Sequence, residues 1–325
     1  MALLSIPTAP LHGYQVLFSP YSPHRLAFTG AQNYGITGNG CLVLYEKIEG
    51  RGFVEVRRYL WKDGLFDVTW SELSEDVLVV GGGDASVLVF DQKVSRDPVA
   101  VLSGHTAEVS SVQWSVTRQE QLVLSSSWDG SVRVWDPQSR SCVSVFTHHQ
   151  GIVYSASWAP HLPRTFASVS GDEQICLWDL SQPNPTTIYH AHSGELLSCD
   201  WSKYDPNVLF TGGVDTAVRM WDIRNLTSPV LVMGGHTQAV RRIKCDPFRG
   251  NIVLSCSYDF TVRVWDVGRP ATPLLDTIGH HREFTFGLDL SALEQGKVAD
   301  CSWDGSIKVY SPACLAPSDP LAKLH

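Results

Sequence analysis

The chain has 325 residues, a formal net charge of −8 and 11 tryptophans, a high number for an otherwise ordinary globular composition. Proteins that bind a phosphate backbone need a basic stripe, so the acidic balance argues against nucleic acid and favours cationic partners. No stretch approaches the roughly 20 consecutive apolar residues that span a bilayer, and the first residues lack the basic start of a signal peptide. We therefore expect no direct membrane insertion and a cytoplasmic location.

The predicted elements begin with a short apolar stretch at residues 3–6, followed by units of similar pattern and length. Four of these units end in a Trp-Asp pair, and successive pairs are 43, 43 and 44 residues apart. The complete series of unit ends, with weaker matches toward both termini, is Tyr45-Glu46, Phe90-Asp91, Trp135-Asp136, Trp178-Asp179, Trp221-Asp222, Trp265-Asp266 and Tyr310-Ser311. This period is typical of WD repeats, and seven units fill the chain.

The third unit shows the expected strands most clearly. Residues 109–114 alternate as a strand, residues 122–126 form the next, and residues 132–135 form another. Asp129-Gly130, between the last two, is a strong signal for a tight hairpin turn. Each unit is therefore predicted to contain an outer strand followed by three inner strands.

These units together predict a closed ring. A four-stranded blade cannot bury both of its faces alone, so blades stack around an axis and the last blade joins the first. The final unit lacks its outer strand, which residues 3–6 can supply. We predict an all-β fold, a seven-bladed WD-repeat β-propeller with four-stranded antiparallel blades, in a single domain over residues 1–325. Residues from about 312 are expected to form a loose tail.

A histidine, a Ser or Thr, an Asp and a Trp recur at equivalent places in four units. These types would suit a hydrolase, but an enzyme does not need four copies of its active site, so we expect no catalytic residues. In WD repeats such residues form a hydrogen-bonded chain that satisfies buried polar groups, each of which would otherwise cost about 1–3 kcal/mol. The four structural sets are His105, Ser125, Asp129 and Trp135; His149, Ser168, Asp172 and Trp178; His192, Thr211, Asp215 and Trp221; and His236, Ser255, Asp259 and Trp265.

Neighbouring histidines suggest a metal site at three places, His148-His149, His190 with His192, and His280-His281. One member of each group belongs to the repeat pattern, and Cys or carboxylate neighbours at ligand spacing are missing. No glycine-rich loop of the nucleotide-binding types follows a strand. We therefore expect neither a metal nor another cofactor.

The loops that enter the innermost strands of a propeller converge on one rim of the central channel, which is the expected binding face. The positions before the turn Asp hold Trp128, Tyr258 and Trp303, with Val214 in another unit. Around the start of the innermost strand lie Phe66, Tyr154, Leu197, Phe284 and Phe286, interspersed with Asp63, Asp67, Glu108, Glu195 and Arg241. Aromatic anchors bordered by carboxylates suit a cationic, partly apolar partner. The alternative is that these aromatic side chains pack between blades.

Several stretches between the Trp-Asp pairs are more specific than the repeat itself. Residues 61–72 (WKDGLFDVTWSE), 195–201 (ELLSCDW), 256–263 (CSYDFTVR) and 298–304 (VADCSWD) resemble the receptors for type 2 peroxisomal targeting signals. The resemblance covers nearly the whole chain and departs mainly in the first ten residues and the tail. It implies a cytoplasmic import receptor that shuttles to the peroxisome. Its implied partners are cargo proteins with an N-terminal R-[L/I/V]-x5-[H/Q]-[L/A] signal, a co-receptor peroxin and the peroxisomal docking complex.

Such a signal, folded as a helix, places its first, second, fifth, eighth and ninth residues on one stripe that can lie in an aromatic groove. The expected acceptors for the cargo arginine and the other polar end are Asp63, Asp67, Glu108 and Glu195. The expected apolar and aromatic contacts are Phe66, Trp128, Tyr154, Leu197, Tyr258, Trp303, Phe284 and Phe286.

Two other binding roles remain open from the sequence. Trp221-Asp222-Ile223-Arg224 matches the W-D-x-R motif of substrate-recruiting subunits of cullin-type ubiquitin ligases. A general protein scaffold is the second alternative, although a passive scaffold has no need of an aromatic and acidic ring.

Overall fold

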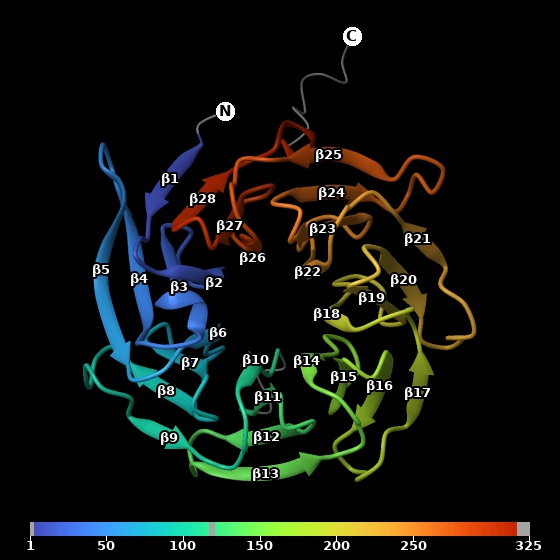
Figure 1. Cartoon of the computed structure of the whole chain (residues 1–325), viewed down its shortest axis with the longest axis horizontal. Helices are drawn as coiled ribbons and strands as arrows, with labels where there is room; N and C mark the ends of the chain where they lie inside the picture. The colour runs from blue at the N-terminus through green and yellow to red at the C-terminus, as the bar shows by residue number, and fades with distance from the viewer. Residues whose placement is uncertain (1–2, 117–120, 317–325) are drawn as a thin grey trace.

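The chain forms seven four-stranded antiparallel sheets arranged as blades around a central channel (Figure 1). The computed structural model describes residues 3–116 and 121–316. In blades 1 to 6, numbered in chain order, four consecutive strands run from the channel outward. The prediction of a seven-bladed propeller is confirmed.

The first four blades contain sixteen consecutive strands. Blade 1 comprises β2 (His12–Phe18), β3 (Arg25–Ala31), β4 (Gly40–Ile48) and β5 (Gly52–Trp61). Blade 2 comprises β6 (Leu65–Trp70), β7 (Val77–Gly82), β8 (Val87–Asp91) and β9 (Ala100–Leu102). Blade 3 comprises β10 (Val109–Trp114), β11 (Val123–Ser127), β12 (Val132–Asp136) and β13 (Ser141–Phe146). Blade 4 comprises β14 (Val153–Trp158), β15 (Thr165–Ser170), β16 (Gln174–Asp179) and β17 (Thr187–His190).

The last three blades complete the ring. Blade 5 comprises β18 (Leu196–Trp201), β19 (Val208–Gly213), β20 (Val218–Asp222) and β21 (Leu231–Met233). Blade 6 comprises β22 (Val240–Cys245), β23 (Ile252–Ser257), β24 (Val262–Asp266) and β25 (Leu274–Ile278). Blade 7 comprises β26 (Thr285–Leu290), β27 (Val298–Ser302), β28 (Ser306–Tyr310) and the N-terminal β1 (Leu4–Pro7).

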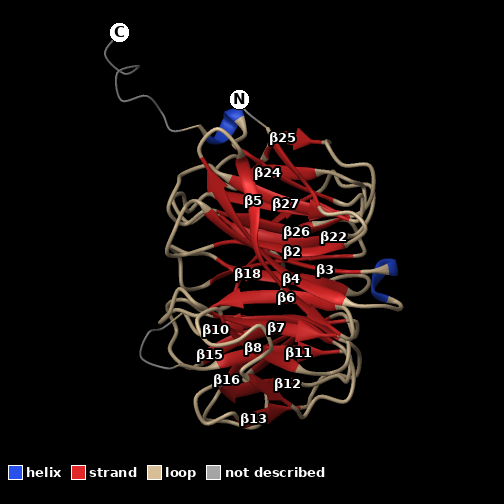
Figure 2. Cartoon of the chain, turned by 90° about the vertical axis from the view of Figure 1, so that its left-hand side faces the viewer, coloured by secondary structure: helices blue, strands red, loops and turns tan. Residues whose placement is uncertain are grey.

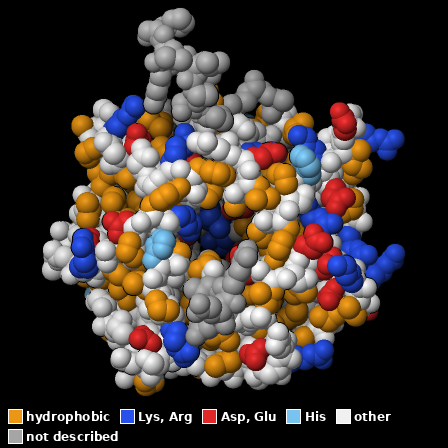
Figure 3. Space-filling view, turned by 180° about the vertical axis from the view of Figure 1, so that it is seen from behind, with side chains coloured by type: hydrophobic (Ala, Val, Ile, Leu, Met, Phe, Trp, Pro, Cys, Tyr) orange, Lys and Arg blue, Asp and Glu red, His pale blue; other side chains and the backbone are white. Residues whose placement is uncertain are grey.

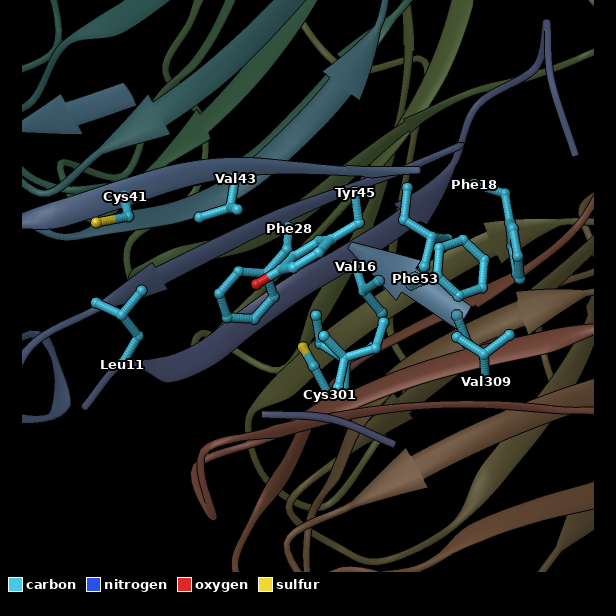
Figure 4. Close-up of a cluster of buried hydrophobic side chains, with 14 residues drawn as sticks. Leu11, Val16, Phe18, Phe28, Cys41, Val43, Tyr45, Phe53, Cys301 and Val309 are labelled. Atoms are coloured by element: carbon cyan, nitrogen blue, oxygen red, sulfur yellow. The ribbon is translucent and has the colours of Figure 1, made fainter. Parts of the chain in front are cut away.

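The ring closes as the sequence predicts, because β1 pairs antiparallel with β28 and aligns Leu4 with Val309. A buried apolar cluster then joins both ends of the chain. It contains Val16 and Phe28 of blade 1 and Cys301 of blade 7 (Figure 4). Burying such side chains contributes roughly 1.5–3 kcal/mol each, so the closure rests on packing as well as on strand pairing.

Two short 3-10 helices lie outside the blades. The helix η1 (Asn33–Gly35) projects beyond the sheets beside β3 on one face of the ring (Figure 2). The helix η2 (Ala313–Leu315) differs from the loose tail expected from about residue 312. Its Leu315 is fully buried, and the Leu315 carbonyl accepts a hydrogen bond from Arg249 at 2.9 Å. Apolar packing therefore holds the chain to residue 315, and residues 317–325 of the expected tail lie outside the described residues.

Across residues 3–116 and 121–316, no helix combines the length and apolar character that a membrane crossing requires.

Candidate functional site

Every innermost strand carries an irregularity at the same place, near the end where η1 projects. The register with the second strand shifts across one residue in all seven blades. A β-bulge of this kind re-aims a side chain, so seven bulged residues surround the channel. In blade order they are Tyr14, Phe66, Ser110, Tyr154, Leu197, Arg241 and Phe286.

A second ring of residues lies just above the bulges. In six blades the residue before the turn Asp donates its backbone N–H, at 2.8–3.1 Å, to the carbonyl two residues before the bulge. This bond holds the two loops together and presents both side chains at the rim. Blade 3 thereby presents Glu108 with Trp128, and blade 7 presents Phe284 with Trp303.

These rings enclose a cavity of about 460 Å³ at the mouth of the channel, called here the mouth cavity. Its walls are Tyr14, Tyr34, Gly35, Ile36, Phe66, Glu108, Ser110, Trp128, Tyr154, Arg241, Tyr258, Phe286 and Trp303. Seven of the predicted site residues meet there: Phe66, Glu108, Trp128, Tyr154, Tyr258, Phe286 and Trp303. The alternative that these side chains all pack between blades therefore does not hold.

One side of the mouth cavity is a continuous aromatic surface. The ring of Tyr14 lies 4.8 Å from that of Phe66 and 5.0 Å from that of Phe286. Phe286 also stacks on Trp303 at 4.6 Å, and Tyr258 lies 5.1 Å from Phe286. Blades 2, 1, 7 and 6 thus supply a partly open aromatic wall, which suits an apolar side chain of a ligand.

The other side carries the acidic groups. Glu108 is half-buried in the cavity wall beside Trp128, whose side chain is 47% exposed. Glu195 is exposed at the rim and accepts a hydrogen bond from the Tyr154 hydroxyl at 2.9 Å. Burial and this carboxylate both raise the pKa of Tyr154, so the phenol stays protonated and continues to donate.

Five predicted residues do not line the mouth cavity, and one of them is Glu195, the rim carboxylate described above. The sequence predicts Asp67 as an acceptor for a cargo arginine, but this residue is only 3% exposed. Its carboxylate accepts the Val112 N–H at 2.9 Å and pairs with Arg242 at 3.2 Å. The bulge explains this placement, because it turns Phe66 toward the mouth and leaves Asp67 inside the channel. Leu197 is also buried and lines a smaller cavity of about 130 Å³ in the channel.

The remaining two lie close to the cavity. Asp63 is half-buried, and its carboxylate accepts the N–H of Gly64 at 2.7 Å. Phe284 packs behind the aromatic wall, 4.7 Å from Tyr258 and 5.5 Å from Trp303. Phe284 therefore supports the wall, whereas Asp63 and Glu195 border the opening.

The sequence-based site lacks Tyr14, Ser110 and the residues of the η1 loop, of which Tyr34 is 46% and Ile36 82% exposed. Tyr14 could have been found, because it occupies the same position in its unit as Phe66 and Phe286. The η1 loop has no counterpart in the other units and offers no repeat signal. The sequence places Arg241 among the rim residues but gives it no role, although it lies between both cavities.

The four repeated polar sets form the same hydrogen-bonded chain in blades 3 to 6. In blade 3, His105 bonds Asp129 at 2.9 Å and Ser125 at 2.7 Å, and Trp135 donates its indole N–H to Ser125 at 2.8 Å. Burial lowers the pKa of His105, and the imidazole is therefore neutral near pH 7. Burial alone would raise the pKa of Asp129, but hydrogen bonds from Ser131, Thr106 and His105 lower it to about 2.

The equivalent bonds recur in the next three blades at nearly the same distances. His149, His192 and His236 bond their turn carboxylates and hydroxyls, and Trp178, Trp221 and Trp265 donate to the same hydroxyls. The carboxylates are those of Asp172, Asp215 and Asp259, and the hydroxyls are those of Ser168, Thr211 and Ser255. These side chains are buried in the blades, and their polar groups already form hydrogen bonds with one another.

Blade 7 carries a variant of this chain that the sequence pattern does not reveal. His281 bonds Asp304 at 2.8 Å and Asp300 at 2.9 Å, and Tyr310 donates to Asp300 at 2.7 Å. A carboxylate thus replaces the hydroxyl and a phenol replaces the indole. Burial would lower the pKa of His281, but Asp300 and Asp304 raise it to about 9. Among the described residues, His280, His281 and Asp300 are the group close enough to share a metal ion, yet these atoms already bond one another.

The W-D-x-R motif of blade 5 is also engaged within the chain. Trp221 is buried in its polar set, and Arg224 forms an ion pair with Asp222 at 2.5 Å.

Seven bulged blades and the repeated His-Ser/Thr-Asp-Trp chains define a WD-repeat β-propeller, with an open cavity at one end of its channel. A model of the WD domain, G-beta repeat, matches residues 96–136, and a model of the EIPR1 beta-propeller matches residues 137–265. The WD40 beta propeller domain of Doa1 has a TM-score of 0.80, with 20% identity over 95% of both chains. That likeness shows the fold alone.

Similarity to curated proteins is more specific. The peroxisomal targeting signal 2 receptor of Mus musculus is 54% identical over 304 residues, which are 94% of this chain and 95% of the relative. The receptor of Homo sapiens is 51% identical over 94% of both chains. The chain belongs to the family of peroxisomal targeting signal 2 receptors.

Proposed function

We propose that this protein is a non-enzymatic import receptor that binds type 2 peroxisomal targeting signals in its mouth cavity. Its relatives are named as receptors for this signal. The proposal rests on one observation. A half-buried carboxylate, Glu108, and an aromatic wall line the same cavity of about 460 Å³. A helical signal with an arginine and an apolar stripe matches both features. The protein would take cargo in the cytoplasm and shuttle to the peroxisome.

The cargo arginine has one acceptor inside the cavity and two at its border. Glu108 is the first choice, because partial burial strengthens a charge-assisted hydrogen bond to a guanidinium. Asp63 and Glu195 are the second choices, since each already accepts one hydrogen bond from its own surroundings. The aromatic rings of Phe66, Phe286 and Trp303 would receive the apolar residues of the signal.

The energetics of this site favour the participation of a co-receptor peroxin. Ordering a free N-terminal segment as a helix costs roughly 2–5 kcal/mol, and an open cavity covers only one side of the helix. A co-receptor that covers the other side would offset this cost, and the resulting complex would be recognised by the peroxisomal docking complex. Equal affinity for a signal peptide with and without the co-receptor would contradict this part of the proposal.

The test is a titration of a fluorescent peptide carrying the nonapeptide motif, with and without its first arginine. Glu108→Lys should weaken binding by at least about 1 kcal/mol, because it places like charges together in a partly desolvated site. The matched control is Glu49→Lys in the hairpin between β4 and β5, an exposed position on the opposite face. If the peptide binds equally with and without its arginine and to all three proteins, Glu108 is not the acceptor.

A cullin-type ligase subunit and a general scaffold are not favoured by the family to which the chain belongs. Co-purification separates these roles, since a ligase subunit should retain an adaptor propeller and an import receptor should retain peroxins.

A further inference from the structure

Arg241 is a buried cation that bridges the mouth cavity and the smaller cavity in the channel. It is the bulged residue of β22, its side chain lines both cavities, and the residue is 8% exposed. Seen from the opposite face, basic side chains lie deep inside the central opening (Figure 3). A guanidinium at this depth has lost most of its water and needs other partners.

The other cations near the channel have carboxylate partners. Arg242 pairs with Asp67 at 3.2 Å, Lys203 with Asp200 at 2.8 Å, and Lys244 lies 3.8 Å from Asp289. Within residues 3–116 and 121–316, Arg241 forms no ion pair. A buried charge without a counter-ion is costly unless a partner completes it.

The contacts that Arg241 does make are with neutral groups. Its guanidinium carbon lies 5.2 Å from the centre of the Phe286 ring, and the Tyr258 side chain lines the same cavity. A guanidinium has five N–H donors in a planar fork that matches a carboxylate. The aromatic contacts orient this fork and leave donors for a further acceptor in the cavity.

We propose that Arg241 is a carboxylate-binding subsite of the mouth cavity, which takes an Asp or Glu side chain of a bound peptide. This inference rests on the proposed function for the identity of the main ligand. Glu108 on blade 3 and Arg241 on blade 6 line the same cavity with opposite charges. The preferred ligand therefore presents a cation toward blade 3 and an anion toward blade 6, and a second cation near Arg241 is repelled.

The carboxylate can come from a variable position of the targeting signal or from the co-receptor. The first arm of the test measures peptides with a single glutamate, glutamine or lysine at each of the five variable positions of the motif. At one position or more, the glutamate peptide should bind about tenfold more tightly than the glutamine peptide, which is the usual effect of a hydrogen bond between charged groups. The lysine peptide should bind more weakly than the glutamine peptide. Arg241→Gln should abolish this preference, whereas Arg241→Lys should retain part of it.

The second arm measures co-receptor binding to the receptor with a glutamine peptide bound. If the carboxylate belongs to the co-receptor, Arg241→Gln should weaken this step about tenfold and leave the peptide series flat. The matched control is Arg282→Gln, which removes one positive charge from an exposed position close to the same rim. Thermal unfolding verifies that each variant is folded. If Arg241→Gln does not fold, the comparison of glutamate, glutamine and lysine peptides on the unmodified receptor still tests the subsite.

The outcomes separate this inference from the proposed function. If the glutamine peptide itself fails to bind in the presence of the co-receptor, the proposed function fails. If the peptide binds and its binding depends on the first arginine, but Arg241→Gln changes neither the peptide series nor co-receptor binding, only the carboxylate subsite is refuted. A flat glutamate, glutamine and lysine series together with unchanged co-receptor binding also refutes the subsite alone.

Discussion

Two sets of equivalent positions in the blades behave in opposite ways. The buried polar chains of blades 3 to 6 use the same residue types at nearly the same distances, as His105 and His236 show with 2.7 Å bonds to their hydroxyls. The bulged positions at the mouth share their backbone geometry, yet the side chains there are aromatic, aliphatic, hydroxyl-bearing or cationic. Repetition therefore marks positions that stabilise the blades, and variation marks the bulged positions around the channel, where we propose that a ligand binds.

The two sets also differ in how their polar groups are satisfied. Each chain within a blade closes on itself, so that carboxylate, imidazole, hydroxyl and indole all have partners inside one repeat. At the mouth, Glu108 and Arg241 line one cavity without pairing with each other. A satisfied network specifies the fold, whereas unsatisfied charges of opposite sign leave binding energy for a partner.

The largest expected effect breaks a chain inside a blade. Ser125→Ala removes the acceptor of the Trp135 indole and the partner of His105, which leaves two buried groups unsatisfied. We expect the free energy of unfolding to fall by about 2–6 kcal/mol, since each such group costs about 1–3 kcal/mol. Denaturant unfolding measures this loss, and the folded fraction should bind the motif peptide normally.

The control for this substitution is Ser103→Ala, an exposed serine before the same blade. It should change the free energy of unfolding by less than about 0.5 kcal/mol. Equal stability of the two variants would show that the repeated chains do not stabilise the blades.

The sequence is sufficient to predict the structural features that repeat from unit to unit. The Trp-Asp spacing is sufficient to predict the number of blades. The missing outer strand of the last unit is sufficient to predict that β1 closes the ring. Both follow from periodicity, which is visible in one sequence. The rim aromatics Trp128, Tyr258 and Trp303 can be found because they precede a repeated Asp.

The bulges are not predictable in the same way. Strand alternation alone cannot tell which of Phe66 and Asp67 faces the mouth, and the extra residue of the bulge decides it. Leu197 shows the limit of this rule, because it is a bulged residue that lies inside the channel. Asp300 escapes the pattern because a carboxylate occupies the position where the other units have Ser or Thr.

Blade 7 allows the repeated chain to be tested by titration. The pKa of His281 is raised from 6.5 to about 9, so its contribution to stability is complete below pH 6.5 and is lost as the pH rises through 9. We expect the free energy of unfolding to decrease over this range by up to about 3 kcal/mol.

Asp300→Ser sharpens this experiment, because it restores the hydroxyl found in blades 3 to 6. In that variant the second carboxylate beside His281 is gone, and the dependence of unfolding on pH between 6.5 and 9 should become much weaker. An identical pH dependence in both proteins would mean that Asp300 does not hold the proton on His281.

The smallest expected effect lies on the acidic side of the mouth. Tyr154→Phe removes the hydroxyl that donates to Glu195 at 2.9 Å and keeps the ring in the cavity wall. Because the carboxylate is exposed and loses only its orientation, we expect motif-peptide binding to weaken by about 0.5–1.5 kcal/mol and the stability to stay unchanged. Fluorescence titration measures the first and thermal unfolding the second. Loss of stability without loss of binding would place Tyr154 with the structural residues, and the distinction between repeated and variable positions would then fail at this blade.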